Sequence, residues 1–342
     1  MSFQPEERDE ESEELERLQQ GQITPEEFLA ERKSSIRKRS WWSIGIGLLV
    51  ILAHFALFAV AGIGFNLVFR SILFVLGIFF VIAGVWFLYE ARRLTLEDLI
   101  PSPEALDFIR QSPGVTPHFS YIILGCLIAV FFSEMAAGKA ADSGDFRAVE
   151  IAGLLKPDVW TNGEYWRILT SGALHAGFLH IYFNSQALYG LGSSIEILSN
   201  RAHLSIVFLL AIIGGSLLSI IFMPEGRTVG ASGGIMGLIG YLAIYGYRRK
   251  QQLPPDFLRT MLVNIGFVAA FGLIAYQIVD NFAHLGGLLV GSIYGFIQVP
   301  RSLRENPRQV SAVTEALGLI AMGVFVFVSI LSILLILEYI KF

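Results

Sequence analysis

A single serine opens an apolar stretch of the sequence, "VGASGGIMGLIGY", and has the chemistry of a nucleophile. Ser232 lies here among the glycines Gly230, Gly233, Gly234 and Gly237. A serine hydroxyl attacks a carbonyl group efficiently only when a neighbouring base takes its proton. The base must come from another segment, and glycines let the helix that carries it approach closely.

The segment "DNFAHLGGLLVGSIYG" supplies a suitable base, His284. Small residues recur in it at every fourth position, at Ala283, Gly287, Gly291 and Gly295. This spacing places them on one helix face and is typical of membrane helices whose backbones pack closely. We therefore expect the stripe to pack on Gly233 and Gly237. That contact would bring the imidazole of His284 within reach of the Ser232 hydroxyl.

A third segment, "LHAGFLHIYFNSQ", carries two side chains suited to binding a negatively charged oxygen. His180 and Asn184 are four residues apart, so they share one helix face. Imidazole and amide N–H groups on one face suit an oxyanion hole. His175, five residues before His180, would point elsewhere around a helix or lie in the preceding loop.

The composition indicates which elements must position these residues. Of the 342 residues, 54% are hydrophobic and only 16% are charged, whereas soluble domains have about 25% charged residues. A segment of about 20 mostly apolar residues can span a bilayer. The sequence offers nine such segments, at 41–64, 71–90, 119–137, 175–198, 204–223, 232–248, 260–278, 281–299 and 313–339. We therefore predict an all-α, polytopic membrane protein.

The stretch 260–299 is counted as two spans because it is too long for one crossing. The polar sequence "QIVDN" at 277–281 lies in its middle and supplies the break. Polar groups are costly inside a bilayer unless they are paired or functional. We therefore expect one helix to end before this break and the helix of His284 to begin after it.

Basic residues predict how the chain crosses the membrane. Most of the 25 lysines and arginines fall on segments that share a side with residues 1–40, and such an excess marks the cytoplasmic side. We expect a cytoplasmic N-terminus, an extracytoplasmic C-terminus and a long outer loop at 138–174, in a plasma or inner membrane. The spans of Ser232, His284 and His180 would then all start on the outer side.

The predicted organisation has five parts. They are a cytoplasmic charged tail at 1–40, a two-helix hairpin at 41–90, a cytoplasmic linker at 91–118, the core at 119–299, and a linker with a C-terminal helix at 300–342. Within the tail, "ITPEEF" predicts the start of a short soluble helix, with Thr24 as N-cap and Glu27 completing a capping box. Gly77 lies in the added hairpin, outside the core, so Gly77→Val should change neither stability nor activity.

Several function classes receive no support. The net charge of −4 gives no basic surface for nucleic acid. The single cysteine, Cys126, provides neither a disulfide framework nor a metal-ligand spacing. We therefore expect no metal, no organic cofactor and no nucleic-acid partner, and we expect contact with membrane lipids.

Each polar residue also has a structural explanation. A serine flanked by glycines in a membrane helix usually only packs, and His284 alone would be a hydrogen-bonded packing residue. His180 and Asn184 could join two helices or bind a transported ligand. The alternative to an enzyme is therefore a non-catalytic membrane binding protein or a transporter. The combination of three spans that carry these groups at one depth favours catalysis.

The same stretches, in this order, resemble the rhomboid intramembrane serine proteases. The matching motifs are "YWRILTS", "HAGFLHIYFN", "GASG" and "AHLGGLLVG", within residues 115–300. The resemblance implies a six-helix core, to which this chain adds an N-terminal hairpin and one C-terminal helix. It also implies an endopeptidase that cuts transmembrane segments of single-span or polytopic membrane proteins near the outer membrane face.

The resemblance further assigns roles to single residues. It implies Ser232 as nucleophile and His284 as general base, in a dyad without an acidic third member. His180, Asn184 and the backbone N–H of Ser232 would donate to the oxyanion. The supporting residues would be His175, Gly230, Gly233, Gly287, Gly291, Trp166, Arg167 and Glu196.

Three of these positions carry more specific expectations. Trp166 and Arg167 match a loop that lies half-embedded in the outer leaflet, and Glu196 matches a structural carboxylate at the inner end of its helix. One position departs from the family pattern. Met236 stands where rhomboids commonly have an aromatic residue that packs on the catalytic imidazole.

Overall fold

Helices dominate the described part of the chain. The structure is a computed structural model, and it describes residues 17–18, 20–60, 72–99, 115–138, 146–254 and 256–340. The start of the charged tail, residues 61–64 of the first predicted span and residues 100–114 of the predicted linker lie outside these ranges.

A long helix occupies each of the nine predicted spans within the described residues. These helices are α2 (Pro25–Val60), α4 (Ile72–Arg93), α7 (His118–Ala136), α11 (Phe178–Leu198), α12 (Arg201–Phe222), α13 (Ser232–Arg248), α14 (Phe257–Ile274), α15 (Asn281–Gln298) and α16 (Ala312–Ile336). The break predicted at 277–281 is confirmed, because α14 ends at Ile274 and α15 begins at Asn281. The chain is an all-α membrane protein with several crossings.

Hydropathy separates the nine helices into two groups. By length and composition, α2, α4, α7, α12, α14 and α16 could each cross a membrane. Within the described residues α11, α13 and α15 do not meet the same test, and they are the helices that carry His180, Ser232 and His284. Helix α13 is too short, with 17 residues. Glycine and polar side chains lower the mean hydropathy of α11 and α15. Polar side chains inside a membrane protein mark a functional site by default.

Helix α2 is longer than predicted. Its capping box is present, since the backbone N–H of Thr24 donates to Glu27 Oε2 (2.8 Å) and the N–H of Glu27 donates to Thr24 Oγ1 (3.2 Å). The helix then continues for 36 residues to Val60, a length of about 54 Å. The predicted short soluble helix is therefore the first part of the same helix that contains the first span. No glycine or proline separates the two, so nothing interrupts the backbone hydrogen bonds.

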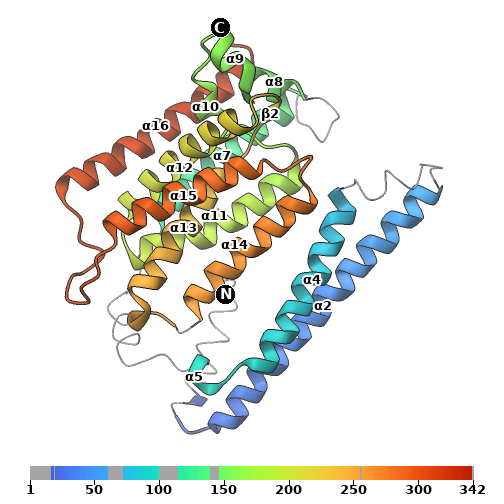
Figure 1. The fold of residues 1–342 in the computed structure, drawn as a ribbon, viewed down its shortest axis with the longest axis vertical. Coiled ribbons are helices and arrows are strands. Elements are labelled where there is room, and N and C mark those ends of the chain that lie inside the picture. Colours follow the sequence, from blue (N-terminus) through green and yellow to red (C-terminus); the bar gives the residue numbers. More distant parts are fainter. Residues whose placement is uncertain are drawn as a thin grey trace. The chain divides into compact units, whose positions relative to one another are not determined.

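The helices cluster into two compact units. The first contains residues 1–105, 253–256 and 266–279, and the second contains 106–252, 257–265 and 280–342. In the first unit α2 and α4 lie side by side as a hairpin (Figure 1). They are closely packed at Gly77, where an added Cβ would lie 2.6 Å from Ile51 Cγ1 and 3.0 Å from Gly47 O. The prediction that Gly77→Val leaves stability unchanged is therefore wrong, because a larger side chain would overlap α2.

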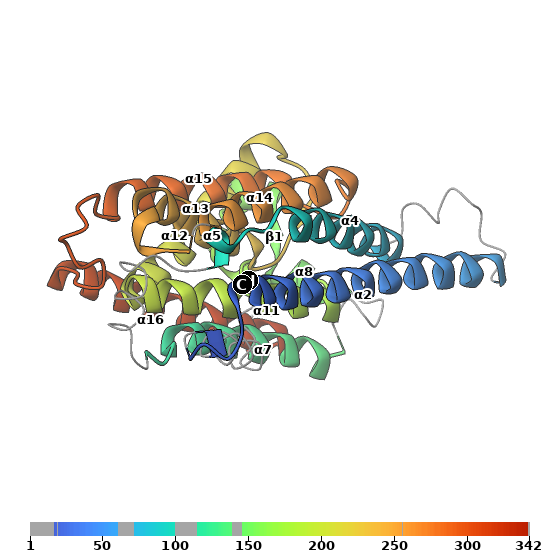
Figure 2. The same cartoon turned by 90° about the horizontal axis from the view of Figure 1, so that it is seen from below.

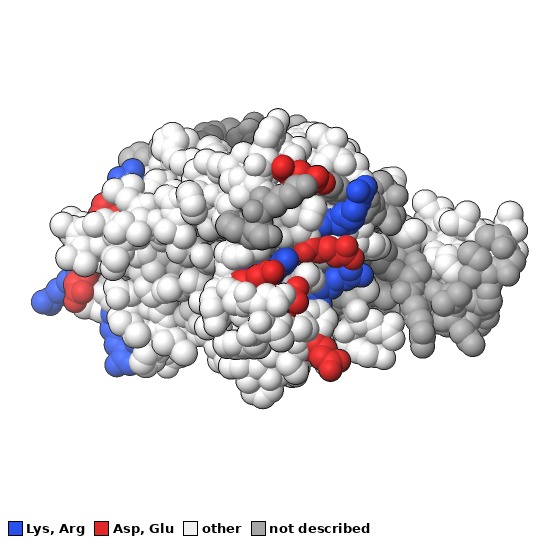
Figure 3. Space-filling view, turned by 90° about the horizontal axis from the view of Figure 1, so that it is seen from above, with Lys and Arg blue, Asp and Glu red and all other residues white. Residues whose placement is uncertain are grey.

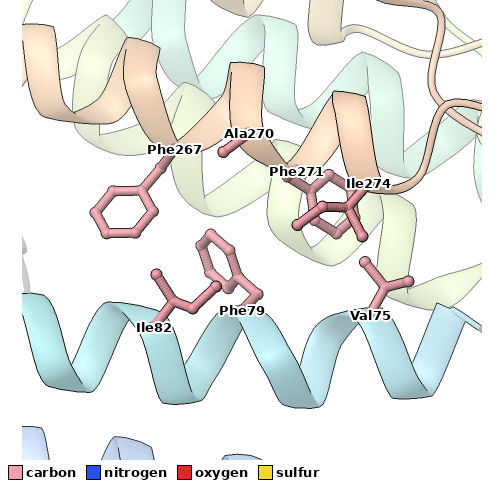
Figure 4. A pocket seen from close by; sticks show the side chains of 7 residues that line it. All are labelled: Val75, Phe79, Ile82, Phe267, Ala270, Phe271 and Ile274. Atoms are coloured by element: carbon pink, nitrogen blue, oxygen red, sulfur yellow. The ribbon is translucent and has the colours of Figure 1, made fainter.

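The later part of α14 belongs to the same unit and faces α4 through apolar side chains. Figure 4 shows Phe79 and Ile82 of α4 and Phe267 and Phe271 of α14 pointing toward the space between the two helices. The ring of Phe79 lies edge-on to Phe267 at 5.7 Å and to Phe271 at 6.0 Å between centroids. Edge-to-face contacts of this kind add to the stabilisation from burial alone, so they join this part of α14 to the hairpin.

The second unit is a helix bundle. Helices α12, α13 and α15 pack against one another, α16 packs on α12 and α7, and α11 lies between α7 and α13 (Figures 1 and 2). The described residues between α7 and α11 form three short helices, α8 (Arg147–Ala152), α9 (Lys156–Thr161) and α10 (Arg167–Thr170). Strand β1 (Leu154–Leu155), from the same segment, pairs antiparallel with β2 (Arg227–Thr228). This pairing joins the loop region to the chain that leads into Ser232.

The charged groups near these short elements are of mixed sign. Figure 3, which views the molecule from above, shows acidic and basic side chains next to one another with uncharged surface around them. One exposed pair joins the loop to β2, with Arg227 Nη1 at 3.4 Å from Glu150 Oε1. Exposed pairs contribute little to stability. The mixture leaves no extended patch of one sign in this view.

Candidate active site

Three helix starts meet at one end of the second unit. His180, Ser232 and His284 each lie in the first turn of their helices, α11, α13 and α15. We call this end, where α11, α13 and α15 begin, the site end. A Cβ added at Gly233, next to Ser232, would lie 3.5 Å from the backbone oxygen of Ala283, next to His284. Segments more than 50 residues apart in the sequence therefore deliver these residues to one place.

The glycine stripe of α15 packs on α13 as predicted. A Cβ added at Gly287 would lie 2.8 Å from the carbonyl carbon of Gly233, and one added at Gly291 would lie 2.5 Å from that of Gly237. Real Cβ atoms do not approach a backbone that closely, so only glycine permits this contact. Ser232 directly precedes Gly233, and His284 precedes Gly287 by three residues.

Ser232 and His284 lie next to this contact, one on each helix. Both Ser232 and His284 are half-buried. Nδ1 of His284 is buried and has no hydrogen-bond partner among the described residues. Hydrogen bonds between catalytic groups are often long before substrate binds. A serine hydroxyl and an imidazole thus lie on neighbouring helix starts.

His180 presents a hydrogen-bond donor to the loop before Ser232. Its Nδ1 accepts a hydrogen bond from the backbone N–H of Ala176 at 3.3 Å. In a neutral imidazole the other nitrogen then carries the proton, so Nε2 is a donor. A Cβ added at Gly230 would lie 2.8 Å from this Nε2 atom. The donor is thus next to the backbone two residues before Ser232.

Asn184 provides a second donor at the same position. The residue is buried, and its Nδ2 has no hydrogen-bond partner among the described residues. It lies one helical turn after His180, and a Cβ added at Gly230 would be 3.7 Å from Nδ2. A buried, unpaired amide N–H costs free energy. Such a donor is explained if an oxygen that forms during a reaction becomes its partner.

Gly230 is required by this geometry. Its φ of 125° lies in the region that glycine adopts and other residues rarely do. An added Cβ would also lie 2.6 Å from Cε1 of His180. Its N–H donates to the backbone oxygen of Ser171 at 2.9 Å. A small cavity next to Ser232, lined also by Ser171, Thr228, Gly230 and Ala283, has room for a water molecule.

Comparison with known proteins shows which family the chain resembles. The model of the Rhomboid domain matches residues 162–301. This range contains α11, α13 and α15. A relative described as "Putative rhomboid protease YdcA", from Bacillus subtilis (strain 168), is 30% identical over 145 residues, which cover 42% of this chain and 72% of the relative. The chain belongs to the rhomboid family.

Other rhomboid relatives are longer than the matched region. "Rhomboid protease GluP" from Bacillus subtilis (strain 168) is 32% identical over 178 residues, 51% of this chain and 34% of that protein. "RHOMBOID-like protein 6, mitochondrial" from Arabidopsis thaliana is 35% identical over 140 residues, 39% of this chain and 44% of that protein. The chain thus spans less than half the length of either of these two relatives.

In this rhomboid, Arg167 holds the segment between α7 and α11 together. Its guanidinium group is buried and donates to the backbone oxygens of Glu150, Ile151 and Gly153 at 3.1, 3.1 and 2.8 Å. These carbonyls belong to the end of α8, where a helix leaves acceptors unpaired. Arg167 also forms an ion pair with Glu164 and stacks on the ring of Trp166 at 4.6 Å. The motif "YWRILTS" therefore organises the loop region.

Glu196 and His175 support the rhomboid bundle in different ways. Glu196 Oε1 accepts from the backbone N–H groups of Phe119 (2.8 Å) and Ser120 (3.1 Å), which caps the N-terminus of α7. His175 lies in the loop before α11, where it is buried and edge-on to His180 at 5.1 Å. Its backbone N–H donates to Glu134 Oε1 at 3.3 Å. These contacts position helix ends and the ring of His180.

One polar cluster at the site end was not predicted from the sequence. Asp280 was expected only as part of a polar break, and no role was expected for Lys156, Ser219 or Thr228. In the structure these four side chains are joined by hydrogen bonds and an ion pair. The one local signal was that Asp280 immediately precedes the helix of His284, as an N-cap residue does.

Proposed function

We propose that this protein is an intramembrane serine endopeptidase that cuts the transmembrane segments of other membrane proteins. The observation that supports this most strongly is a pair of N–H donors two residues before Ser232, one of which, Asn184 Nδ2, has no hydrogen-bond partner among the described residues. His180 Nε2 and Asn184 Nδ2 both lie next to Gly230. A packing serine has no need of two such donors. Relatives named as rhomboid proteases, GluP and YdcA, support the same activity.

The proposed reaction proceeds through an acyl-enzyme. Ser232 Oγ attacks the carbonyl carbon of the scissile bond while His284 takes the hydroxyl proton. The carbonyl oxygen becomes negative and accepts hydrogen bonds from His180, Asn184 and the backbone N–H of Ser232. His284 then donates its proton to the leaving nitrogen, and the C–N bond breaks. Water, activated by His284, releases the acyl group and restores Ser232.

The proposed topology places the site end on the extracytoplasmic side, with the N-terminus in the cytoplasm. It rests on the excess of lysine and arginine on the tail's side of the membrane. Substrates would be single-span or polytopic membrane proteins, cut near the outer face. Ser232 lies at the start of α13, so water can reach the cavity beside it from that face.

The test is co-expression with a panel of tagged single-span proteins. We expect the intact protein to cleave at least one of them and to react with a fluorophosphonate probe, whereas Ser232→Ala should do neither. A non-catalytic binding protein or transporter would leave every tagged protein intact and would not react with the probe. Cleavage by Ser232→Ala at the normal rate would contradict the proposal.

The oxyanion donors give a quantitative prediction. Asn184→Ala should lower kcat by up to about 100-fold, since loss of one such donor costs about 10²–10³-fold in a soluble protease and His180 remains. Probe labelling should persist. Adding His180→Ala should lower kcat further. The control is Asn162→Ala, which removes an exposed amide in the loop region. Normal kcat in the double variant would refute the role of both donors.

A further inference from the structure

A partly buried carboxylate at the start of α15 connects three separate segments. Asp280 Oδ1 accepts the backbone N–H of Ala283 at 2.9 Å, so it is the N-cap of the histidine helix. Its Oδ2 accepts the hydroxyl of Thr228 at 2.6 Å and that of Ser219, near the end of α12. Lys156 Nζ lies 3.2 Å from the same oxygen.

Lys156 is unusual for a lysine in a loop region. Its side chain is only 2% exposed, and lysine is almost never buried without a partner. It directly follows β1, and its backbone N–H donates to Gly226 O at 3.2 Å, in the loop before Ser232. We call residues 226–231, which precede Ser232, the serine loop. Lys156 thus contacts the serine loop through its backbone N–H and Asp280 through its side chain.

Thr228 and Asp280 stand at the same sequence distance before the two residues of the proposed dyad. Thr228 lies four residues before Ser232, and Asp280 lies four residues before His284. Their hydrogen bond therefore connects the segment before the proposed nucleophile with the segment before the proposed base. The serine loop contains Gly226 and Gly230, both with positive φ. Glycine gives a loop conformational freedom, so this loop needs a tether to hold one position.

We infer that Asp280 is a positioning residue that holds the Ser232 loop against the start of the His284 helix through Thr228 and Lys156. The inference rests on the proposed function, which it extends. The glycine stripe of α15 sets how closely α13 and α15 pack after Ser232 and His284 in the sequence. The side chains joined to Asp280 set the position of the loop that precedes Ser232.

The charge state of the cluster fits this role. Burial raises the pKa of the Asp280 carboxyl group, but its hydrogen bonds and the ammonium group of Lys156 outweigh burial and lower the pKa below its ordinary value. Asp280 is therefore ionised at neutral pH. An ionised acceptor makes stronger hydrogen bonds than a neutral one, which favours a single position of the Thr228 hydroxyl.

The first test removes only the bond between the loop and the helix start. Thr228→Val keeps the shape of the side chain but loses the hydroxyl. We expect kcat to fall about 10–100-fold with KM nearly unchanged, because a displacement of about 1 Å can reduce a rate by 10²-fold. Thr228→Ser restores the hydroxyl and should restore kcat. A normal kcat in Thr228→Val, with or without a lower Tm, would overturn the inference.

The control removes a comparable bond elsewhere in the bundle. Ser205 Oγ donates to Gly318 O at 2.7 Å and joins α12 to α16. It lies near the start of α12, whereas Ser219 lies near its end, about 20 Å along the helix. Ser205→Ala is expected to lower Tm and to leave kcat unchanged. This variant separates loss of stability from loss of positioning.

A double variant tests whether Thr228 acts through Asp280. Asp280→Asn should lower kcat, and adding Thr228→Val to it should lower kcat little further, because both changes break one connection. Losses that multiply in the double variant would show that the two residues act separately, which would overturn the inference.

Amide hydrogen exchange measures how firmly the serine loop is held, and this measurement does not depend on catalysis. We expect the amides of residues 226–231 to exchange faster in Thr228→Val than in the unsubstituted protein and at the normal rate in Ser205→Ala. If the unsubstituted protein neither cleaves nor reacts with the probe, the proposed function fails, and the exchange rates alone decide whether Asp280 holds the loop. Unchanged exchange in Thr228→Val would overturn the tether.

Discussion

Replacing either member of the dyad is expected to abolish cleavage. Ser232→Ala removes the nucleophile and His284→Ala removes the group that takes its proton. In a soluble serine protease each such change lowers kcat by about 10⁶-fold. We expect losses of similar size here, and we expect the double variant to be little worse than either single one, because the two residues act as a unit. Cleavage rates of one membrane substrate in detergent would measure this.

A matched control separates the base from other histidines. His118 is exposed at the start of α7, next to the residues that Glu196 caps and away from the three helix starts of the site end. His118→Ala should retain normal cleavage and probe labelling. If the losses of Ser232→Ala and His284→Ala multiplied in the double variant, the dyad assignment would be wrong.

Gly287→Val is expected to inactivate the protein although it touches no catalytic atom. An added Cβ would already lie 2.8 Å from the carbonyl carbon of Gly233 and 3.2 Å from its Cα. The two helices must therefore separate, at the roughly 1–3 kcal/mol that overpacking typically costs. The catalytic loss should be larger, because about 1 Å of displacement between reacting groups can reduce the rate about 100-fold. Thermal aggregation and cleavage of one substrate measure the two effects.

The control for this change is a helical glycine without close neighbours. Gly323 lies in α16, and no heavy atom lies within 4 Å of a Cβ added there. Gly323→Val should therefore leave both stability and cleavage close to normal. Gly77 is unsuitable, because its Cβ would meet Ile51 of α2. A stable and fully active Gly287→Val would show that the glycine stripe does not set the approach of the serine and histidine helices.

Much of the fold followed from local patterns. The nine long helices were predictable because a bilayer demands about 20 apolar residues, which can be counted along the chain, although only six of them are apolar and long enough by themselves to cross a membrane. The division at 277–281 followed from polar residues in a stretch too long for one crossing. The packing of Gly287 and Gly291 on α13 followed from a spacing of four residues on one helix face. Such features depend on residues close together in the sequence.

Other features depended on helix continuity and on neighbours from another helix. The N-cap at Thr24 was predicted, but the helix that starts there continues into the first span. Gly77 showed no constraint in its own segment, and its constraint comes from Ile51 on the partner helix. The sequence of one segment does not reveal which residues of another will lie against it.

The chemistry of the site divides in the same way. The sequence alone determined that Ser232, His284, His180 and Asn184 stand near the starts of three helices, because helix boundaries follow from local composition. Only the tertiary structure decided that His180 accepts a hydrogen bond from Ala176 and therefore presents Nε2 as a donor. Only the tertiary structure joined Lys156, Thr228 and Asp280. These partners lie 52 or more residues apart, and their meeting depends on how the whole bundle packs rather than on any pattern within one segment.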